Sequence, residues 1–114
     1  MAIREREVDG VRILDLKGKI TGGEGSAKLK QRLADLVDAG YERIVINLAG
    51  VPYVDSSGLG ELVRCFTAAQ KAGGGVKLSS PSRRLIDLFN LTKLSTILDI
   101  CDTDAEAIES FTKR

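Results

Sequence analysis

The sequence predicts a single α/β domain with a mixed, mainly parallel sheet and an N-terminal β-hairpin, in the element order ββαβαβαβα. Strand-like and helix-like runs alternate along the chain, which favours parallel strands joined by right-handed crossovers. The first two strand-like runs are separated only by Asp9-Gly10, a dipeptide typical of a tight hairpin. The 114 residues contain neither a Pro/Gly/Ser-rich linker nor an internal repeat, so we predict one domain over residues 1–114.

The opening hairpin is expected to pair strands at Ile3–Val8 and Val11–Lys17. The first strand is mostly charged, which is typical of an edge strand that must not pair with a neighbouring molecule. The second strand is more apolar, and we therefore place it further inside the sheet.

A helix is predicted next over Ser26–Ala39, where apolar residues recur at helical spacing and Gly40 supplies a left-handed stop. Its apolar stripe comprises Leu29, Leu33, Leu36 and Val37. The following run, Ile44–Leu48, is almost continuously apolar and rich in β-branched residues. That pattern is typical of a parallel strand covered by helices on both faces.

The apolar helical pattern resumes at Leu59 and ends at Ala72, immediately before the run Gly73–Gly75, which we expect to break the helix. A strand at Val76–Leu78 follows.

The last third of the chain is predicted to hold two helices and one short strand. Ser80 and Pro81 have the residue types of an N-cap and a first helical residue, with Leu85, Leu88 and Phe89 as the buried stripe. The short strand is expected at Ile97–Ile100. Thr103 and Glu106 have capping-box spacing, so the last helix should begin there and turn Ala107, Ile108 and Phe111 inward.

Composition excludes several classes of function. The net charge is only +1, whereas nucleic-acid binders are typically strongly basic. No direct contact with nucleic acid is therefore expected. The chain has no histidine, which removes the commonest general base and most zinc sites. We therefore expect no catalytic residues, no bound metal and no cofactor, and we predict that the protein is not an enzyme.

The sequence also favours a cytoplasmic protein without membrane insertion. Its apolar runs are far shorter than the roughly 20 residues needed to span a bilayer. The first ten residues are charged where a signal peptide needs an apolar segment. Cys65 and Cys101 form no CxxC pair and sit in apolar surroundings, so both are expected to be reduced core residues.

The most informative segment is Pro52–Leu62, between a buried strand and a helix. Asp55, Ser56 and Ser57 are residue types that cap helices, so one interpretation of them is structural. Gly58 and Gly60 weaken that interpretation, because each glycine costs a helix about 0.5–1 kcal/mol relative to alanine. We expect these glycines to open the backbone so that another surface can approach the serines.

A serine at this position could also carry a phosphoryl group, which adds a charge of about −1.5 to −2. The free N–H groups and the dipole of a helix N-terminus favour an anion, so the modification should leave the domain folded. Its effect should appear in binding instead, since the new charge would repel an acidic partner and would lose its water against an apolar one.

Enzymatic interpretations of the same segment fit less well. Gly58-x-Gly60-x-x-Val63 lacks the third glycine of the dinucleotide-binding fingerprint, and Asp55 places negative charge where a pyrophosphate would lie. Ser56 lacks the glycine two residues earlier that a GxSxG hydrolase requires.

Three segments carry a resemblance that covers nearly the whole chain. Val54–Gly60, the Gly73–Val76 break before a strand, and the Leu88–Leu91 region resemble bacterial anti-sigma factor antagonists of the STAS domain family. The resemblance implies a STAS-like single domain that binds an anti-sigma factor with serine kinase activity and so frees a sigma factor. It also implies that the serine directly after the aspartate, Ser56, is phosphorylated, that this blocks productive binding, and that a serine phosphatase reverses it.

The resemblance further implies a partner-binding surface. It would consist of Asp55, Ser56, Ser57, Gly58, Leu59 and Gly60, extended by the loop Gly18–Ser26 with Thr21. One departure concerns that loop: many relatives carry an acidic residue shortly after the glycine that ends the second strand, where this chain has Lys19 and Thr21. The sequence therefore leaves open which partner is bound. It also leaves open whether the protein forms a weak homodimer.

An alternative function within the same family also stays open. STAS-like modules occur in stress-signalling assemblies such as the stressosome, and as small subunits of lipid-transport ATPase complexes. A fold alone does not separate these roles from sigma-factor release.

Overall fold

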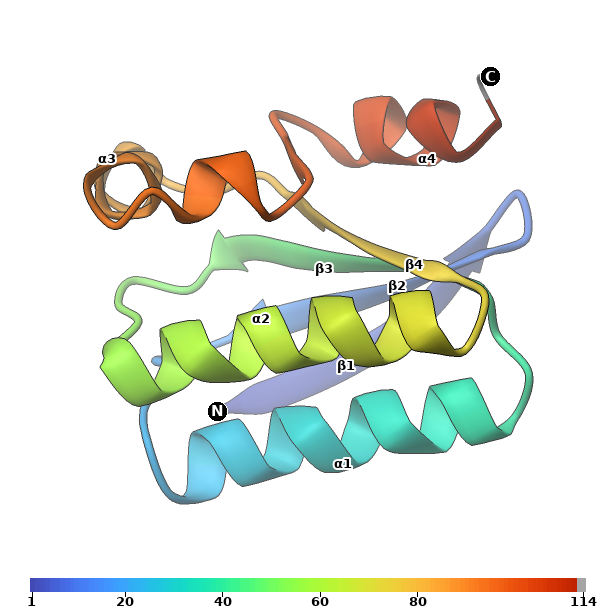
Figure 1. Cartoon of the computed structure of the whole chain (residues 1–114), viewed down its shortest axis with the longest axis horizontal. Coiled ribbons are helices and arrows are strands. Elements are labelled where there is room, and N and C mark those ends of the chain that lie inside the picture. The colour runs from blue at the N-terminus through green and yellow to red at the C-terminus, as the bar shows by residue number, and fades with distance from the viewer. Residues whose placement is uncertain (113–114) are drawn as a thin grey trace.

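In the computed structural model, which describes residues 1–112, five strands form one mixed sheet in the spatial order β1-β2-β3-β4-β5. Helices α1 and α2 cover one face of the sheet, and α4 lies over the other (Figure 1). Helix α3 follows β4 and contributes its buried Leu85 and Phe89 to the same core as α1 and α2. The elements are β1 (Ala2–Val8), β2 (Val11–Lys17), α1 (Glu24–Asp38), β3 (Arg43–Gly50), α2 (Ser56–Lys71), β4 (Gly75–Ser79), α3 (Arg83–Leu91), η1 (Leu94–Thr96), β5 (Ile100–Cys101) and α4 (Asp104–Thr112). The predicted α/β class and element order are confirmed. The last two positions of the predicted domain, 113 and 114, lie outside the described residues.

The opening hairpin has the predicted form. β1 pairs antiparallel with β2, and the turn between them places Asp9 at φ 51° and Gly10 at φ 78°, as a type I′ turn requires. β1 is an edge strand, and most of its residues are exposed or half-buried charges. The other strand pairs, β2–β3, β3–β4 and β4–β5, are all parallel.

The central strand β3 is buried on both faces, which explains its continuous apolar run. Because successive side chains of a strand point to opposite faces, its residues divide between two cores. Ile44, Ile46 and Leu48 belong to the larger core, which also contains the buried leucines of α1 and α2. Val45 belongs to a smaller core with Val11, Ile13 and Ala107 of α4.

The first helix is close to its predicted position. α1 begins at Glu24, two residues before the expected start at Ser26, and Gly40 follows its end with φ 92°. α2 begins at Ser56, earlier than the apolar pattern from Leu59 suggested, because Asp55 caps it.

The predicted start of the third helix is wrong. β4 continues to Ser79, and Ser80 then adopts a left-handed conformation with φ 54°, so neither Ser80 nor Pro81 is part of a helix start. The N-cap is Ser82, whose hydroxyl accepts a hydrogen bond from the Leu85 N–H at 3.2 Å. The residues between β4 and α3 therefore form a turn, and the helix starts later than the sequence pattern suggested.

The predicted strand at Ile97–Ile100 is also misplaced. A single 3₁₀ turn, η1, occupies Leu94–Thr96, and Ile97 is half-exposed. β5 contains only Ile100 and Cys101, because it pairs only with the last residues of β4. Leu98, which contributed to the strand-like pattern, is buried beneath this turn without being in a strand.

The last helix begins where its capping residues predicted. Thr103 Oγ1 accepts a hydrogen bond from the Glu106 N–H at 3.1 Å, and the Glu106 carboxylate accepts one from the Asp102 N–H at 3.1 Å. Ala107 is fully buried, and Ile108 and Phe111 pack against the smaller core.

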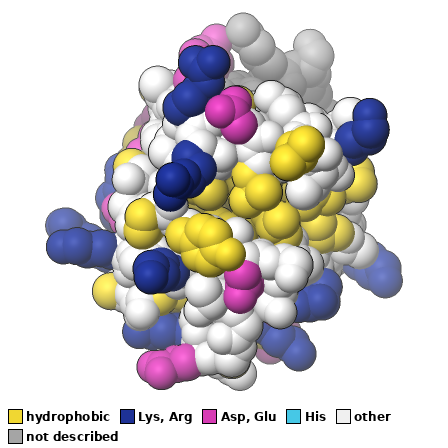
Figure 2. Space-filling view, turned by 90° about the vertical axis from the view of Figure 1, so that its left-hand side faces the viewer, with side chains coloured by type: hydrophobic (Ala, Val, Ile, Leu, Met, Phe, Trp, Pro, Cys, Tyr) yellow, Lys and Arg dark blue, Asp and Glu magenta, His cyan; other side chains and the backbone are white. Residues whose placement is uncertain are grey.

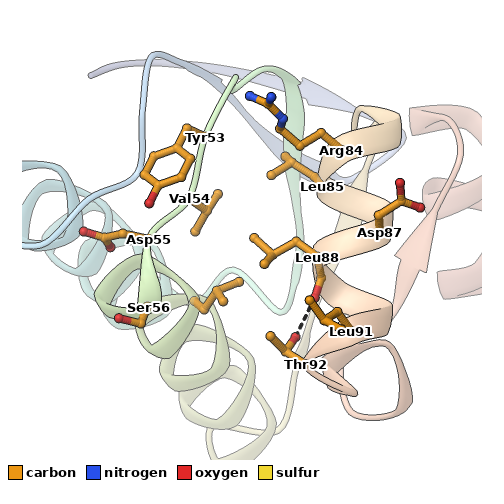
Figure 3. Close-up of a pocket in the computed structure, with 11 residues that line it drawn as sticks. Tyr53, Val54, Asp55, Ser56, Arg84, Leu85, Asp87, Leu88, Leu91 and Thr92 are labelled. Carbon is orange, nitrogen blue, oxygen red and sulfur yellow. Dashed lines mark hydrogen bonds between the residues drawn. The ribbon is translucent and has the colours of Figure 1, made fainter.

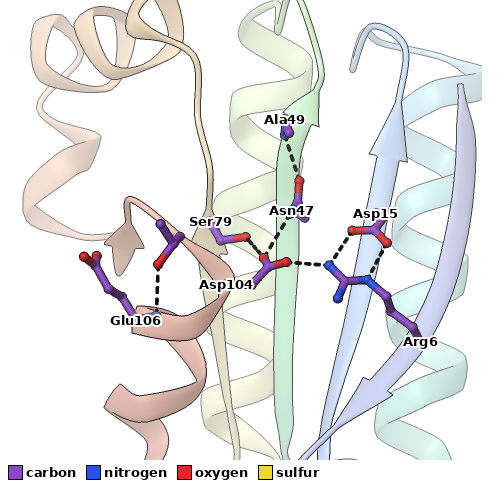
Figure 4. A network of polar contacts seen from close by, with 8 residues as sticks. Arg6, Asp15, Asn47, Ala49, Ser79, Asp104 and Glu106 are labelled. Carbon is purple, nitrogen blue, oxygen red and sulfur yellow. Dashed lines mark hydrogen bonds and ion pairs between the residues drawn. The ribbon is translucent and has the colours of Figure 1, made fainter.

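Asp104, at the start of α4, ties this helix to the sheet (Figure 4). Its Oδ1 accepts hydrogen bonds from the Ser79 hydroxyl at 2.5 Å and from the Asn47 amide at 2.9 Å. Its Oδ2 accepts one from Arg6, whose guanidinium also pairs with Asp15 through Nε at 2.6 Å. Burial raises the pKa of Asp104, but the hydrogen bonds from Ser79, Arg6 and Asn47 outweigh it and hold the pKa below its ordinary value.

Both cysteines are free, as expected. Cys65 is buried in the larger core, and Cys101 is half-buried beside the smaller one. Burial raises the pKa of the Cys65 thiol to about 12. Residues 1–112 contain no helix of the length and apolarity needed to cross a bilayer.

Candidate functional site

The candidate site lies where two loops meet at the N-terminal end of α2. The loop from β2 to α1 and the loop from β3 to α2 form a parallel bridge between Ile20 and Val54. The Ile20 N–H donates to the Tyr53 carbonyl at 3.0 Å, and the Asp55 N–H donates to the Ile20 carbonyl at 3.2 Å. The two loops therefore form one continuous surface around the start of α2.

Asp55 holds this surface together through both of its carboxylate oxygens. Oδ1 accepts a hydrogen bond from the Gly58 N–H at 2.7 Å and so caps α2. Oδ2 accepts one from the Gly22 N–H at 3.1 Å, in the other loop. These hydrogen bonds, from Gly58 first and Gly22 second, lower the pKa of Asp55, so the residue is ionised at neutral pH. The structural interpretation of Asp55 as an N-cap is confirmed.

The two glycines of this turn have different surroundings. A Cβ atom on Gly58 would lie 2.2 Å from the Ile20 carbonyl oxygen, so Gly58 is needed for close packing between α2 and the neighbouring loop. The expectation that Gly58 opens the backbone to an approaching molecule is therefore wrong. A Cβ atom on Gly60 would meet only the Arg64 side chain, at 3.4 Å or more, so this position is open.

Ser56 and Ser57 are both exposed, but they border different parts of the surface. A Cβ atom on Gly22 would lie 3.1 Å from Ser57 Oγ, which shows that Ser57 packs closely against the β2–α1 loop. Ser56 lines a groove on the other side and makes no side-chain hydrogen bond within residues 1–112. Of the two hydroxyls, that of Ser56 is therefore the more accessible to another protein.

The groove beside Ser56 has a volume of about 690 Å³ and lies between the start of α2 and helix α3 (Figure 3). It is lined by Tyr53, Val54, Asp55, Ser56, Leu59, Arg84, Leu85, Asp87, Leu88, Leu91 and Thr92. Apolar side chains gather at the centre of this end of the molecule, with charged side chains around them (Figure 2).

The remaining predicted site residues are close to this surface. Thr21 is half-buried in the β2–α1 loop, and its carbonyl accepts hydrogen bonds from the Ser26 N–H at 3.0 Å and from the Ser26 hydroxyl at 2.8 Å. It directly precedes Gly22, which Asp55 holds. Leu59 is buried and contributes to the groove wall. The structure thus brings Thr21 together with the segment Asp55–Gly60.

The contribution of α3 to this surface was not predicted from the sequence. Leu91 is 82% exposed on one side of the groove, and Tyr53 is 46% exposed on the other. A signal was present, because Leu91 lies beyond the buried stripe of Leu85 and Phe89 and is followed by polar residues. Only the three-dimensional structure shows that α3 lies beside α2.

The site contains an accessible hydroxyl, a carboxylate engaged in structural hydrogen bonds, and an apolar groove. Among residues 1–112, no group of three or more Cys, Asp or Glu side chains is arranged to hold a metal ion. The arrangement is suited to contact with another macromolecule and to modification at Ser56.

Comparison with known proteins identifies the family. The model of the STAS domain matches residues 2–107. The chain belongs to the STAS domain family. The resemblance inferred from the Val54–Gly60 segment is therefore confirmed, together with the STAS fold.

Named relatives of this STAS domain are regulatory proteins. It is 43% identical over 72 residues to an anti-sigma-B factor antagonist from Bacillus subtilis, a match that spans 63% of this chain and only 65% of that relative. It is 35% identical over 106 residues to an anti-sigma-B factor antagonist from Listeria monocytogenes, covering 91% and 90% of the two chains. A crystal structure from Thermotoga maritima, provisionally described as an anti-sigma factor antagonist, superimposes with a TM-score of 0.89 at 29% identity and covers 97% and 95% of the two chains.

Proposed function

We propose that this STAS domain is an anti-sigma factor antagonist, which binds an anti-sigma factor in the cytoplasm and thereby frees a sigma factor for transcription. The observation that carries the proposal is the Ser56 hydroxyl, which is exposed, without a hydrogen-bond partner in residues 1–112, and located on a surface suited to protein contact. The similarity to named antagonists from Bacillus and Listeria supports the same assignment.

Phosphorylation of Ser56 is the proposed switch. The anti-sigma factor would supply the serine kinase activity, and a serine phosphatase would restore the free hydroxyl. The start of α2 should tolerate a phosphate, because the helix dipole favours an anion there and the Ser56 side chain is exposed. The fold should therefore survive the modification.

Phosphorylation of Ser56 should, in contrast, weaken binding of the anti-sigma factor. A phosphate brings a charge of about −1.5 to −2 next to the ionised Asp55 and the apolar groove. A partner that buries this surface must remove water from the new charge and faces added repulsion from it. A loss of about 3 kcal/mol in binding free energy corresponds to roughly a hundredfold weaker affinity.

Two substitutions at Ser56 test the proposal against a purified anti-sigma factor by isothermal calorimetry. Ser56→Ala should bind like the wild type, and Ser56→Asp should bind at least about tenfold more weakly. Ser95→Asp is a matched control, because Ser95 is exposed in η1 and does not line the groove, so that the substitution adds the same charge outside it. Equal affinity of the two Ser56 variants would refute the switch, and absence of wild-type binding would refute the antagonist function.

Intact-mass measurement after incubation with the anti-sigma factor and ATP tests the modification itself. The wild type should gain the mass of one phosphate, which should map to Ser56, and Ser56→Ala should gain none. A phosphate that maps to Ser57 would contradict the assignment of the modified residue.

A further inference from the structure

A second cavity lies between α1 and α2, and it shares no lining residue with the groove beside Ser56. The two helices lie side by side on one face of the sheet (Figure 1). The cavity has a volume of about 380 Å³, and much of its wall is apolar, from Leu33, Ala34 and Val37 of α1 and Ala68 of α2. Sites for small molecules usually have volumes of about 300–1,000 Å³, so this cavity has the size of a small-ligand site.

One charged side chain of this cavity is buried. Glu61 of α2 is only 3% exposed and lines the cavity. Its Oε1 accepts a hydrogen bond from Arg64 at 3.3 Å. Within residues 1–112 the only donor to its Oε2 is the thiol of Cys65, at 3.6 Å. A carboxylate can accept about four hydrogen bonds, and a thiol is a weak donor. Oε2 therefore lacks the strong donor that a buried carboxylate needs.

The other charges of the cavity are exposed to solvent. Lys30 and Asp38 of α1 are both exposed and carry opposite charges. The Arg64 side chain is 62% exposed and contacts only Oε1 of Glu61. Exposed charges are screened by water and salt, whereas a buried charge is screened much less. The charge that selects a ligand inside the cavity is therefore the carboxylate of Glu61.

We propose that the cavity between α1 and α2 binds a small aliphatic amine, whose ammonium group donates to Glu61 Oε2 and whose hydrocarbon chain contacts Leu33 and Val37. The ammonium supplies the positive charge and the strong donor that the Cys65 thiol does not. The chain gains affinity by leaving water for the apolar wall. This site is independent of the proposed antagonist function, because no residue of the Ser56 groove takes part in it.

Titration of the ¹⁵N-labelled protein with n-hexylamine, followed by NMR, tests the class of ligand. The amine should shift amide signals of α1 and α2 around Leu33 and Glu61, and the shifts should saturate. Hexan-1-ol and hexanoate have the same chain length without the positive charge. The alcohol should bind at least about tenfold more weakly than the amine, because it forms no charge-assisted hydrogen bond, and hexanoate should not bind. Absence of saturable amine binding, or equal affinity for the amine and the alcohol, would overturn the proposal.

Glu61→Gln tests the role of the carboxylate. The substitution keeps the size of the side chain and removes its charge, so n-hexylamine should bind at least about tenfold more weakly. Glu24→Gln is the matched control, because Glu24 is exposed at the start of α1 and does not line the cavity. This control makes the same change of net charge and should bind the amine as the wild type does.

Ala34→Leu tests the cavity without changing any charge. Ala34 is exposed and lines the cavity, so a leucine should fill part of the space and weaken amine binding while the domain stays folded. Ala27→Leu is its control, because Ala27 is exposed on the same helix outside the cavity. Circular dichroism checks the fold of each variant. Wild-type affinity for the amine in folded Glu61→Gln or in Ala34→Leu would overturn the site, and neither result would bear on binding of an anti-sigma factor beside Ser56.

Discussion

Gly58 and Gly60 lie two residues apart in the first turn of α2, yet alanine should have opposite effects on stability at the two positions. At Gly58 the new methyl group would lie 2.2 Å from the Ile20 carbonyl oxygen and 2.8 Å from Val54 Cγ1. At Gly60 its nearest neighbour would be the flexible guanidinium of Arg64, at 3.4 Å.

The magnitudes follow from these distances. A carbon–oxygen contact normally measures about 3.3 Å or more, so the backbone at Ile20 would have to move by roughly 1 Å in Gly58→Ala. Overpacking of this kind costs about 1–3 kcal/mol, whereas the better helix propensity of alanine returns only about 0.5–1 kcal/mol. Gly58→Ala should therefore lower the free energy of unfolding by about 1–2 kcal/mol, and Gly60→Ala should raise it by about 0.5–1 kcal/mol.

Urea unfolding followed by far-UV circular dichroism measures both effects. With a slope of about 1–3 kcal/mol per molar urea for a domain of this size, the midpoints of the two variants should differ by about 1 M. If Gly58→Ala proved as stable as Gly60→Ala, the close packing of α2 against the β2–α1 loop would not be a structural requirement, and the assignment of Gly58 would be wrong.

Two further predictions concern ionisable groups. Asp104→Asn should lower stability at neutral pH by about 1 kcal/mol, because the ion pair with Arg6 is lost. Since the folded pKa of Asp104 is depressed, its contribution is fully present above the ordinary value of 3.8 and is lost as pH falls through the folded value. The difference between wild type and variant in urea unfolding should therefore narrow below about pH 4, and a difference that stays constant with pH would contradict this assignment. Cys65, buried and with its pKa raised to about 12, should react with a thiol reagent at mildly alkaline pH only as fast as the protein opens. Rapid labelling of Cys65 in the folded protein, measured by mass spectrometry, would show that the core is not closed around it.

Much of the fold could be predicted from the sequence because local patterns and tertiary packing agree there. The charged β1, the Asp9-Gly10 turn and the apolar β3 each have a local pattern that matches their place in the sheet. The errors occur where packing overrides the pattern. The run at Ile97–Ile100 has the composition of a strand. Only Ile100 and the following Cys101 pair with β4, through its last two residues, so the strand is confined to these two positions.

The site was predictable only in part, for a related reason. The segment Asp55–Gly60 is contiguous, so residue types and spacing identified it. The role of Gly58 depends on Ile20, and the groove depends on α3, and both are distant in the sequence. Contacts of that kind leave no local pattern. The sequence therefore indicated a functional loop, but neither the packing of Gly58 nor the groove beside α3.

The β2–α1 loop is fastened at the site through main-chain atoms. The amide of Ile20, the carbonyl of Ile20, the amide of Gly22 and the carbonyl of Thr21 make its hydrogen bonds to the neighbouring loop and to the start of α1. The side chains of Lys19 and Thr21 take no part in these bonds. Substitution at these two positions can therefore change the surface beside the start of α2 while the loop keeps its shape.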